Sequence, residues 1–103
     1  MKIKVPAYPQ IGGHTFSVLF DRTLEDTNIY GSTNFRTQEI RINPLRPISQ
    51  QVGSLIHEFY HIVAVVYANN AISEEVIDST GEGFLQIFNQ FGIELDWSDI
   101  PQV

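Results

Sequence analysis

The sequence His57-Glu58-Phe59-Tyr60-His61 is the feature that most restricts how this 103-residue chain can fold. It lies within a stretch, 49–68, whose apolar residues recur at helical spacing and occupy two sides of a helix. A helix that is apolar on both sides has to be covered on both sides. The sequence therefore predicts a helix from about Ser49 to Ala68 that lies between a sheet and a second helix.

One side of this first helix carries a stripe that we expect to pack on the sheet. Its members are Val52, Leu55, Phe59, Ile62, Val63 and Val66. His57 and His61 lie about 160–200° away around the helix, on a side that continues into small residues such as Ala64. We expect the two histidines to sit where the groove between the two helices opens.

The spacing of the two histidines is suited to a metal ion. Residues i and i+4 of a helix lie about 40° apart and roughly 6 Å along the axis, so two imidazoles can bind one ion. Glu58 is rotated by about 100° from His57, which makes it a poor third ligand. It is instead well placed to take a proton from a water molecule at the metal, as a general base.

The first 45 residues read as strands and turns, which predicts the α+β class with an N-terminal antiparallel sheet of three to four strands. We expect residues 1–103 to form one domain. A polar loop is expected at Asp21–Thr27. The expected strands are Lys2–Val5, Thr15–Phe20 and a hairpin of Asn28–Gly31 with Gln38–Asn43.

A second helix is predicted from the N-cap residue Ser73 to a stop at Gly92. Its expected buried stripe consists of Ile77, Thr80, Phe84, Phe88 and Phe91. The tail, 93–103, alternates apolar and polar residues, so we expect it to pack back on the domain with Trp97 as an anchor.

Composition limits both the metal chemistry and the partners. Cysteine is absent, so a metal site has to use histidine, carboxylate and water. The net charge of −6 and the scattered lysines and arginines argue against a nucleic-acid partner or an anionic membrane. With no apolar leader at the N-terminus and no apolar run long enough to span a bilayer, a cytoplasmic location is expected.

Two histidines need a third protein ligand to make a good zinc site. The extended motif with a third histidine would place Gly and His where the chain has Ala64 and Tyr67. His14 lies far away in a glycine-rich turn. An acid on the second helix is therefore the expected ligand.

Four acids compete for that position. Measured around the helix from Ile77, Glu74 lies at about 60° and Asp78 at about 100°, whereas Glu82 and Glu75 lie at about 140° and 160°. Glu74 is therefore the preferred ligand. Glu75 and Glu82 remain alternatives, although their positions on the helix predict that they point to solvent. Asp78, one turn on, could accept the other N–H of a ligating histidine and fix its tautomer.

The HExxH sequence followed by Glu74-x-x-x-Asp78 resembles the gluzincin signature. Thermolysin is a large member of that group. Minigluzincins, ImmA/IrrE-like proteins and small phage- or prophage-encoded metallopeptidase-like proteins are small ones. The likeness covers roughly 28–91 and includes Gly81-Glu82-Gly83-Phe84-Leu85. It implies one Zn²⁺ ion bound by His57, His61 and Glu74, with Glu58 as the base and Asp78 in support.

The chain also departs from the gluzincin pattern. The gap between His61 and Glu74 is shorter than in thermolysin, while Glu82 follows His61 at close to the spacing of the larger peptidases. No downstream lobe supplies the Tyr or His that stabilises the transition state in the larger enzymes. The candidates within this chain are Tyr30, Tyr60, Tyr67 and His14.

The resemblance implies a zinc-dependent metallopeptidase of narrow specificity and phage-like origin, acting on a protein or peptide substrate. The substrate is expected to add a strand to a sheet edge, formed by either Gln38–Asn43 or Asn28–Gly31. The alternative is a non-catalytic zinc-binding regulatory or interaction protein, in which the metal holds the fold together.

Overall fold

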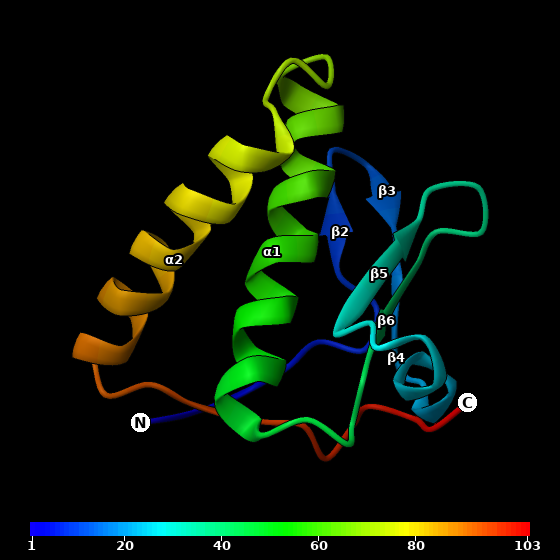
Figure 1. Cartoon of the computed structure of the whole chain (residues 1–103), viewed down its shortest axis with the longest axis vertical. Coiled ribbons are helices and arrows are strands. Elements are labelled where there is room, and N and C mark those ends of the chain that lie inside the picture. Colours follow the sequence, from blue (N-terminus) through cyan, green and yellow to red (C-terminus); the bar gives the residue numbers. More distant parts are fainter.

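Two helices and a small sheet lie in three successive layers in the computed structural model, which describes residues 1–103 (Figure 1). Helix α1 (Ile48–Tyr67) is the middle layer, with α2 (Glu74–Gln90) on one side of it. The sheet on its other side consists of β4 (Ser17–Phe20), β5 (Gly31–Asn34) and β6 (Glu39–Ile42). The smaller elements are β1 (Lys2–Lys4), β2 (Gln10–Ile11), β3 (His14–Thr15), the 3₁₀ helix η1 (Arg22–Thr27) and β7 (Glu94–Asp96). The predicted α+β class and the two predicted helices are confirmed.

The three-stranded sheet is mixed, so the prediction of an antiparallel sheet is wrong in part. Its order is β4-β6-β5, with β6 antiparallel to β5 and parallel to β4. The chain reaches this arrangement because η1 and β5 separate β4 from β6 and provide the long connection that parallel strands need. Strand β6 thereby takes the centre of the sheet, where Ile40 and Ile42 are fully buried.

The hairpin begins three residues later than expected. Its first arm is β5, and Asn28 instead ends η1 in the left-handed conformation. The side chain of Asn34 accepts hydrogen bonds from the backbone N–H groups of Arg36 and Thr37, which forms the turn before β6. The first arm was expected too early in the chain because the polar residues of β5 do not alternate with apolar ones. Polar residues are tolerated there because β5 is an edge strand, which pairs with β6 on one side and with no strand on the other.

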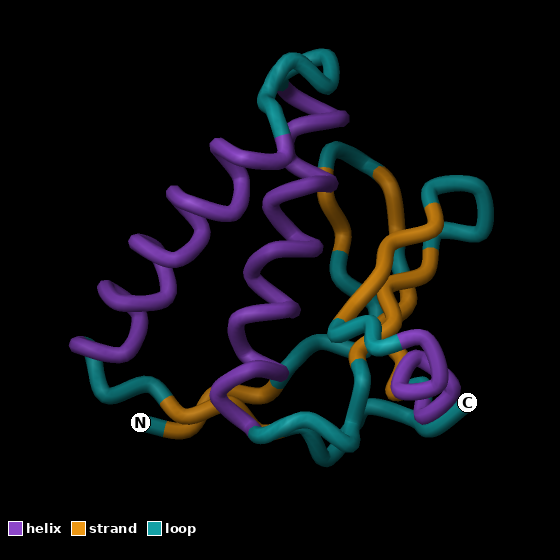
Figure 2. Tube along the Cα trace, viewed as in Figure 1, coloured by secondary structure: helices purple, strands orange, loops and turns teal.

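The predicted packing of the C-terminal tail is confirmed. Strand β7 pairs in parallel with β1, so the first and last strands of the chain lie side by side (Figure 2). Ile100 joins the hydrophobic core, and the ring of Trp97 lies 5.3 Å from that of Phe20. Strand β1 was expected to belong to the N-terminal sheet, but it pairs with β7 of the C-terminal tail instead.

Helix α1 packs on the sheet largely as its periodicity predicts. Leu55 and Ile62 are part of the core, and Phe59 and Val66 pack against it. Val63 was expected in the same stripe but is 42% exposed, because it lies at the border of the face that meets the sheet.

The predicted buried stripe of α2 is confirmed at Ile77 and wrong for the rest of its length. Within this helix only Ile77 and Gly81 are buried, while Phe84 and Phe91 are 54% and 70% exposed. The physical reason is the angle between the helices: α2 diverges from α1 towards its C-terminal end, so α1 leaves much of that half uncovered (Figure 1). The helix bounds themselves are close to the prediction, with the side chain of Ser73 capping the N-terminus by accepting from Val76 N–H.

The polar segment after β4 is ordered by one buried carboxylate. Asp21 caps η1, accepting hydrogen bonds from Thr23 N–H and Thr23 Oγ1 at 2.9 and 2.6 Å. It also pairs with Arg41 of β6, with 2.7 Å between Oδ2 and Nη1. The Thr23 hydroxyl first, and then the Arg41 guanidinium, hold the pKa of Asp21 below its ordinary value. Asp21 therefore joins η1 to the sheet most strongly when it is ionised.

This lowered pKa predicts a specific acid sensitivity of the metal-free protein. Because the pKa of Asp21 is lower in the folded than in the unfolded chain, its stabilising contribution is complete above about pH 4 and declines as the pH falls further. Asp21→Asn should flatten the fall in melting temperature below that pH, measured by circular dichroism with a chelator present. Asp26→Asn, an exposed control in the same segment, should keep the wild-type slope. An unchanged slope in Asp21→Asn would contradict the prediction.

No helix of the chain combines the length and the apolar character needed to cross a bilayer.

Candidate metal centre

The helical backbone of α1 places the two imidazoles side by side. His57 and His61 are one turn apart, and their Nε2 atoms lie 3.0 Å from each other. Each side chain is about one-quarter exposed, at 24% and 26%. The pair therefore faces the space between the helices with two nitrogen donors directed to one point, as the spacing predicts.

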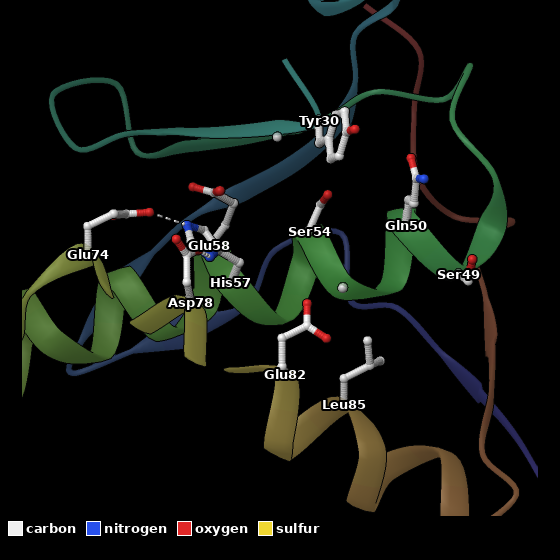
Figure 3. Close-up of a pocket in the computed structure, with 12 residues that line it drawn as sticks. Tyr30, Ser49, Gln50, Ser54, His57, Glu58, Glu74, Asp78, Glu82 and Leu85 are labelled. Carbon is white, nitrogen blue, oxygen red and sulfur yellow. Dashed lines mark ion pairs between the residues drawn. The ribbon is translucent and has the colours of Figure 1, made fainter. Parts of the chain in front are cut away.

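Glu74, in the first turn of α2, brings a carboxylate to the same point. Its Oε1 lies 2.9 Å from His57 Nε2 and its Oε2 lies 2.8 Å from His61 Nε2 (the first contact is drawn in Figure 3). The ligand atoms of these three residues lie within 4.8 Å of one another. His57, His61 and Glu74 form a group that could hold a metal ion.

The donor set and its spacing fit a small divalent ion. Two imidazole nitrogens and one carboxylate are a ligand set found in catalytic zinc sites that keep one position open. Bonds of about 2.0–2.1 Å in tetrahedral geometry need donors about 3.3 Å apart. The three donors lie slightly closer than that, at 2.8–3.0 Å, so small rotations of the side chains would accommodate an ion.

Asp78 lies behind His57, one turn of α2 beyond Glu74. Its Oδ1 is 3.0 Å from His57 Nδ1, the nitrogen that does not face the metal group. A carboxylate in this position accepts the Nδ1–H of the ring, which leaves Nε2 free to act as a ligand. The geometry therefore matches the supporting position expected of Asp78.

Glu58 lies on the sheet side of the site and is held by β5. It is 7% exposed, and its Oε1 accepts a hydrogen bond of 2.6 Å from Thr33 Oγ1. One carboxylate oxygen is thus fixed by a neutral hydroxyl, which orients the group without an opposing charge. Thr33 was not among the expected site residues, because the strand expected at 28–31 ends before it. With the first arm of the hairpin at 31–34, where the structure has it, the Thr33 hydroxyl lies on the strand beside α1.

The metal group opens into a cleft of about 480 Å³ (Figure 3). Its lining residues are Tyr30, Gly31, Ser49, Gln50, Gly53, Ser54, His57, Glu58, Glu74, Asp78, Glu82 and Leu85. Glu82 was expected to point to solvent, but its side chain is directed towards α1 across the cleft. Ile77 marks the side of α2 that faces α1 near its N-terminal end. Because α1 crosses α2 at an angle (Figure 1), the side of α2 that faces α1 further along the helix includes Glu82.

Of the other residues that the sequence suggested for the site, only Tyr30 lines the cleft. Its ring is stacked under the guanidinium of Arg46 at 4.3 Å. Tyr60 lies beside Phe84 outside this cleft, and Tyr67 is 70% exposed at the end of α1. His14 and Glu75 are both exposed and belong neither to the metal group nor to the cleft.

Comparison with known proteins identifies no relative: no family model, no curated protein and no solved structure matches this chain.

Proposed function

We propose that this chain is a zinc-dependent peptidase of zincin-like design, in which Glu58 is the general base. The observation that carries the proposal is the convergence of His57, His61 and Glu74 at the border of a cleft that the buried carboxylate of Glu58 also lines. A zinc ion held by these ligands would supply Lewis acidity, polarising a scissile carbonyl and lowering the pKa of water to about 7.

The residues of the chain divide the remaining tasks. Glu58 takes a proton from the attacking water and delivers it to the leaving amine. The Thr33 hydroxyl holds one Glu58 oxygen at 2.6 Å, which leaves the other free for this proton transfer. Tyr30 is the candidate from this chain for a hydrogen-bond donor to the developing oxyanion, since it lines the same cleft.

The edge of β5 offers the backbone groups that an extended peptide would need. Of the two edges considered from sequence, the strand at 39–42 lies in the sheet centre, which leaves the strand that begins at Gly31. Bonded and non-bonded pairs alternate in an antiparallel ladder, and Asn43 N–H donates to Tyr30 C=O at 2.9 Å. The register therefore turns the backbone N–H and C=O groups of Gly31 and Thr33 away from β6, towards the open edge.

The charge of the cleft favours a particular substrate. Four carboxylates line it (Glu58, Glu74, Asp78 and Glu82), and no lysine or arginine does. A bound Zn²⁺ would neutralise only part of that charge. We therefore expect the preferred peptides to carry Lys or Arg close to the scissile bond.

The direct test is digestion of a diverse peptide library by the zinc-loaded protein, with cleavage sites read by mass spectrometry. The proposal expects zinc-dependent cleavage that stops with a chelator and resumes when zinc is restored. Cleavage sites should be enriched in nearby basic residues. Absence of any cleavage, with zinc bound in stoichiometric amount, would reject the enzymatic proposal.

One observation favours a second function, a non-catalytic zinc-binding interaction protein. Only Ile77 and Gly81 of helix α2 are buried, so most of its side chains remain at least partly exposed beside α1. A metal ion shared by Glu74 and the two α1 histidines would join these helices directly. This reading expects zinc to raise the melting temperature without any turnover, and it would be preferred if the library remained uncut.

The support given by Asp78 can be measured separately. Asp78→Asn keeps the size of the side chain but removes the charge that holds His57 Nδ1–H, so zinc affinity should fall about 10–100-fold. Competition with a chromophoric chelator measures this change. Glu75→Gln is the matched control, because it removes one exposed charge from the same helix end and should leave the affinity within about twofold. Equal losses in both variants would mean that only net charge matters.

A further inference from the structure

A second hollow lies between the two helices, separate from the metal cleft. Its volume is about 460 Å³, and it shares no lining residue with the cleft. All its lining residues are apolar or aromatic: Ile56, Phe59, Tyr60, Val63, Ile72, Phe84 and Phe88. Ile56 and Val63 lie about 160° and 140° around α1 from Glu58, so this hollow opens on the other side of the helix.

An apolar ridge on α2 borders this hollow. Val76, Ile87 and Phe91 are 46%, 52% and 70% exposed, and Phe84, at 54%, belongs to both ridge and hollow. The four residues fall within about 80° of arc, in which the only polar residue is Thr80. The acids of α2 lie on the other edge of the helix, so the ridge and the hollow together form an uncharged face.

This face is large for a free surface. Its five most exposed residues, Val63, Val76, Phe84, Ile87 and Phe91, together expose roughly 400–650 Å², counting about 150–250 Å² for a whole residue. The largest apolar patch of an ordinary monomer is about 300–600 Å². A stable dimer buries about 800 Å² on each partner. The face therefore approaches the area that one side of a dimer needs.

We propose that a second copy of this chain covers this face, with the α2 ridge of each copy filling the hollow of the other. A two-fold axis brings the same patch of both copies together, and a ridge beside a hollow is complementary to itself under that rotation. The uncharged face allows two copies of net charge −6 to meet without opposing carboxylates at the contact. Phe91, at the end of the ridge, would be the anchor of each copy.

The charge of the helices argues against a membrane as the occupant. Helices that lie on membranes carry lysine and arginine beside their apolar face. This chain has no lysine or arginine after Arg46, so neither α1 nor α2 offers one. The same absence disfavours an acidic partner protein.

Sedimentation of the full-length, zinc-loaded protein tests the proposal over a range of concentrations. Wild type should be a dimer at micromolar concentration. Phe91→Glu should raise the dissociation constant about a hundredfold or more, because it places an unpaired carboxylate in an apolar contact. Since Phe91 is 70% exposed within one copy, this variant should keep its circular dichroism spectrum and its bound zinc.

Gln86→Glu is the matched control: it adds the same charge to an exposed position about 140° around α2 from Phe91, and it should leave the dimer intact. A wild type that stays monomeric up to about 100 μM, far above the dissociation constants of specific dimers, would overturn the proposal. So would a dimer that Phe91→Glu does not weaken. Binding of a monomeric wild type to neutral lipid vesicles or to another protein would assign the face to that occupant instead.

Discussion

Replacing His57 or Glu74 by alanine is expected to lower the affinity of the protein for zinc by at least about a hundredfold. Loss of a carboxylate that only supports a ligand costs about 10–100-fold, so loss of a ligand itself should cost more. Each of these residues is one of three whose donor atoms converge within 4.8 Å. Titration against a chelator of known affinity, with metal content after purification as a second measurement, gives the comparison.

The same variants should lose the stabilisation that zinc provides. An ion present at 100 times its dissociation constant stabilises the folded state by about 2.7 kcal/mol. For a domain of about 100 residues this corresponds to roughly 10–20 °C in melting temperature. Wild type should therefore melt about 10–20 °C higher with zinc than with a chelator, whereas the His57 and Glu74 variants should show little difference.

Glu75→Ala and Glu82→Ala are the controls for this experiment. Both remove a carboxylate from the same helix, and Glu82 even lines the cleft, yet neither belongs to the metal group. They should keep the zinc affinity within a few-fold of wild type. If either loses as much affinity as Glu74→Ala, the choice of Glu74 as third ligand is wrong.

Glu58→Gln is expected to lower the turnover number by about a hundredfold to ten-thousandfold, the usual contribution of a general base. The amide cannot accept the proton of the attacking water. Its carbonyl oxygen can still accept the Thr33 hydroxyl hydrogen bond, so the buried side chain keeps its partner. Zinc affinity and melting temperature should therefore stay close to wild type, which separates a catalytic loss from a structural one.

Initial rates on the best peptide from the library, with zinc saturating, measure this effect. Glu75→Gln makes the identical chemical change at an exposed position and should leave the turnover number unchanged. Thr33→Val supplies an intermediate case, because it keeps Glu58 ionisable but removes the hydroxyl that orients it. Full activity in Glu58→Gln would remove Glu58 from the mechanism.

The two helices were predictable because each carries strong local information. The apolar periodicity of α1 and the Ser73 cap of α2 gave bounds within one or two residues of those observed. Helical geometry alone then places residues i and i+4 next to each other on the helix surface. The pairing of His57 with His61 and the common face of Glu74 and Asp78 both follow from that geometry.

The sheet was less predictable because its pairing is not local. Strand β6 pairs with β4 across an intervening helix and strand, and β1 pairs with a segment near the other end of the chain. Alternation shows that a segment can be a strand but not which neighbour it has. The polar strand β5 lacked even alternation, and Thr33 was missed with it.

The sequence by itself determined the helices, the histidine pair and the acids available to complete a metal group, because these depend on the geometry of single helices. Only the tertiary structure decided that Glu74 reaches both histidines, that β5 is the open edge beside Glu58, and that α2 leaves an apolar face uncovered. Each of these depends on the angle and register at which separate elements pack. Many distant contacts set that angle and register together, and no short stretch of sequence contains them.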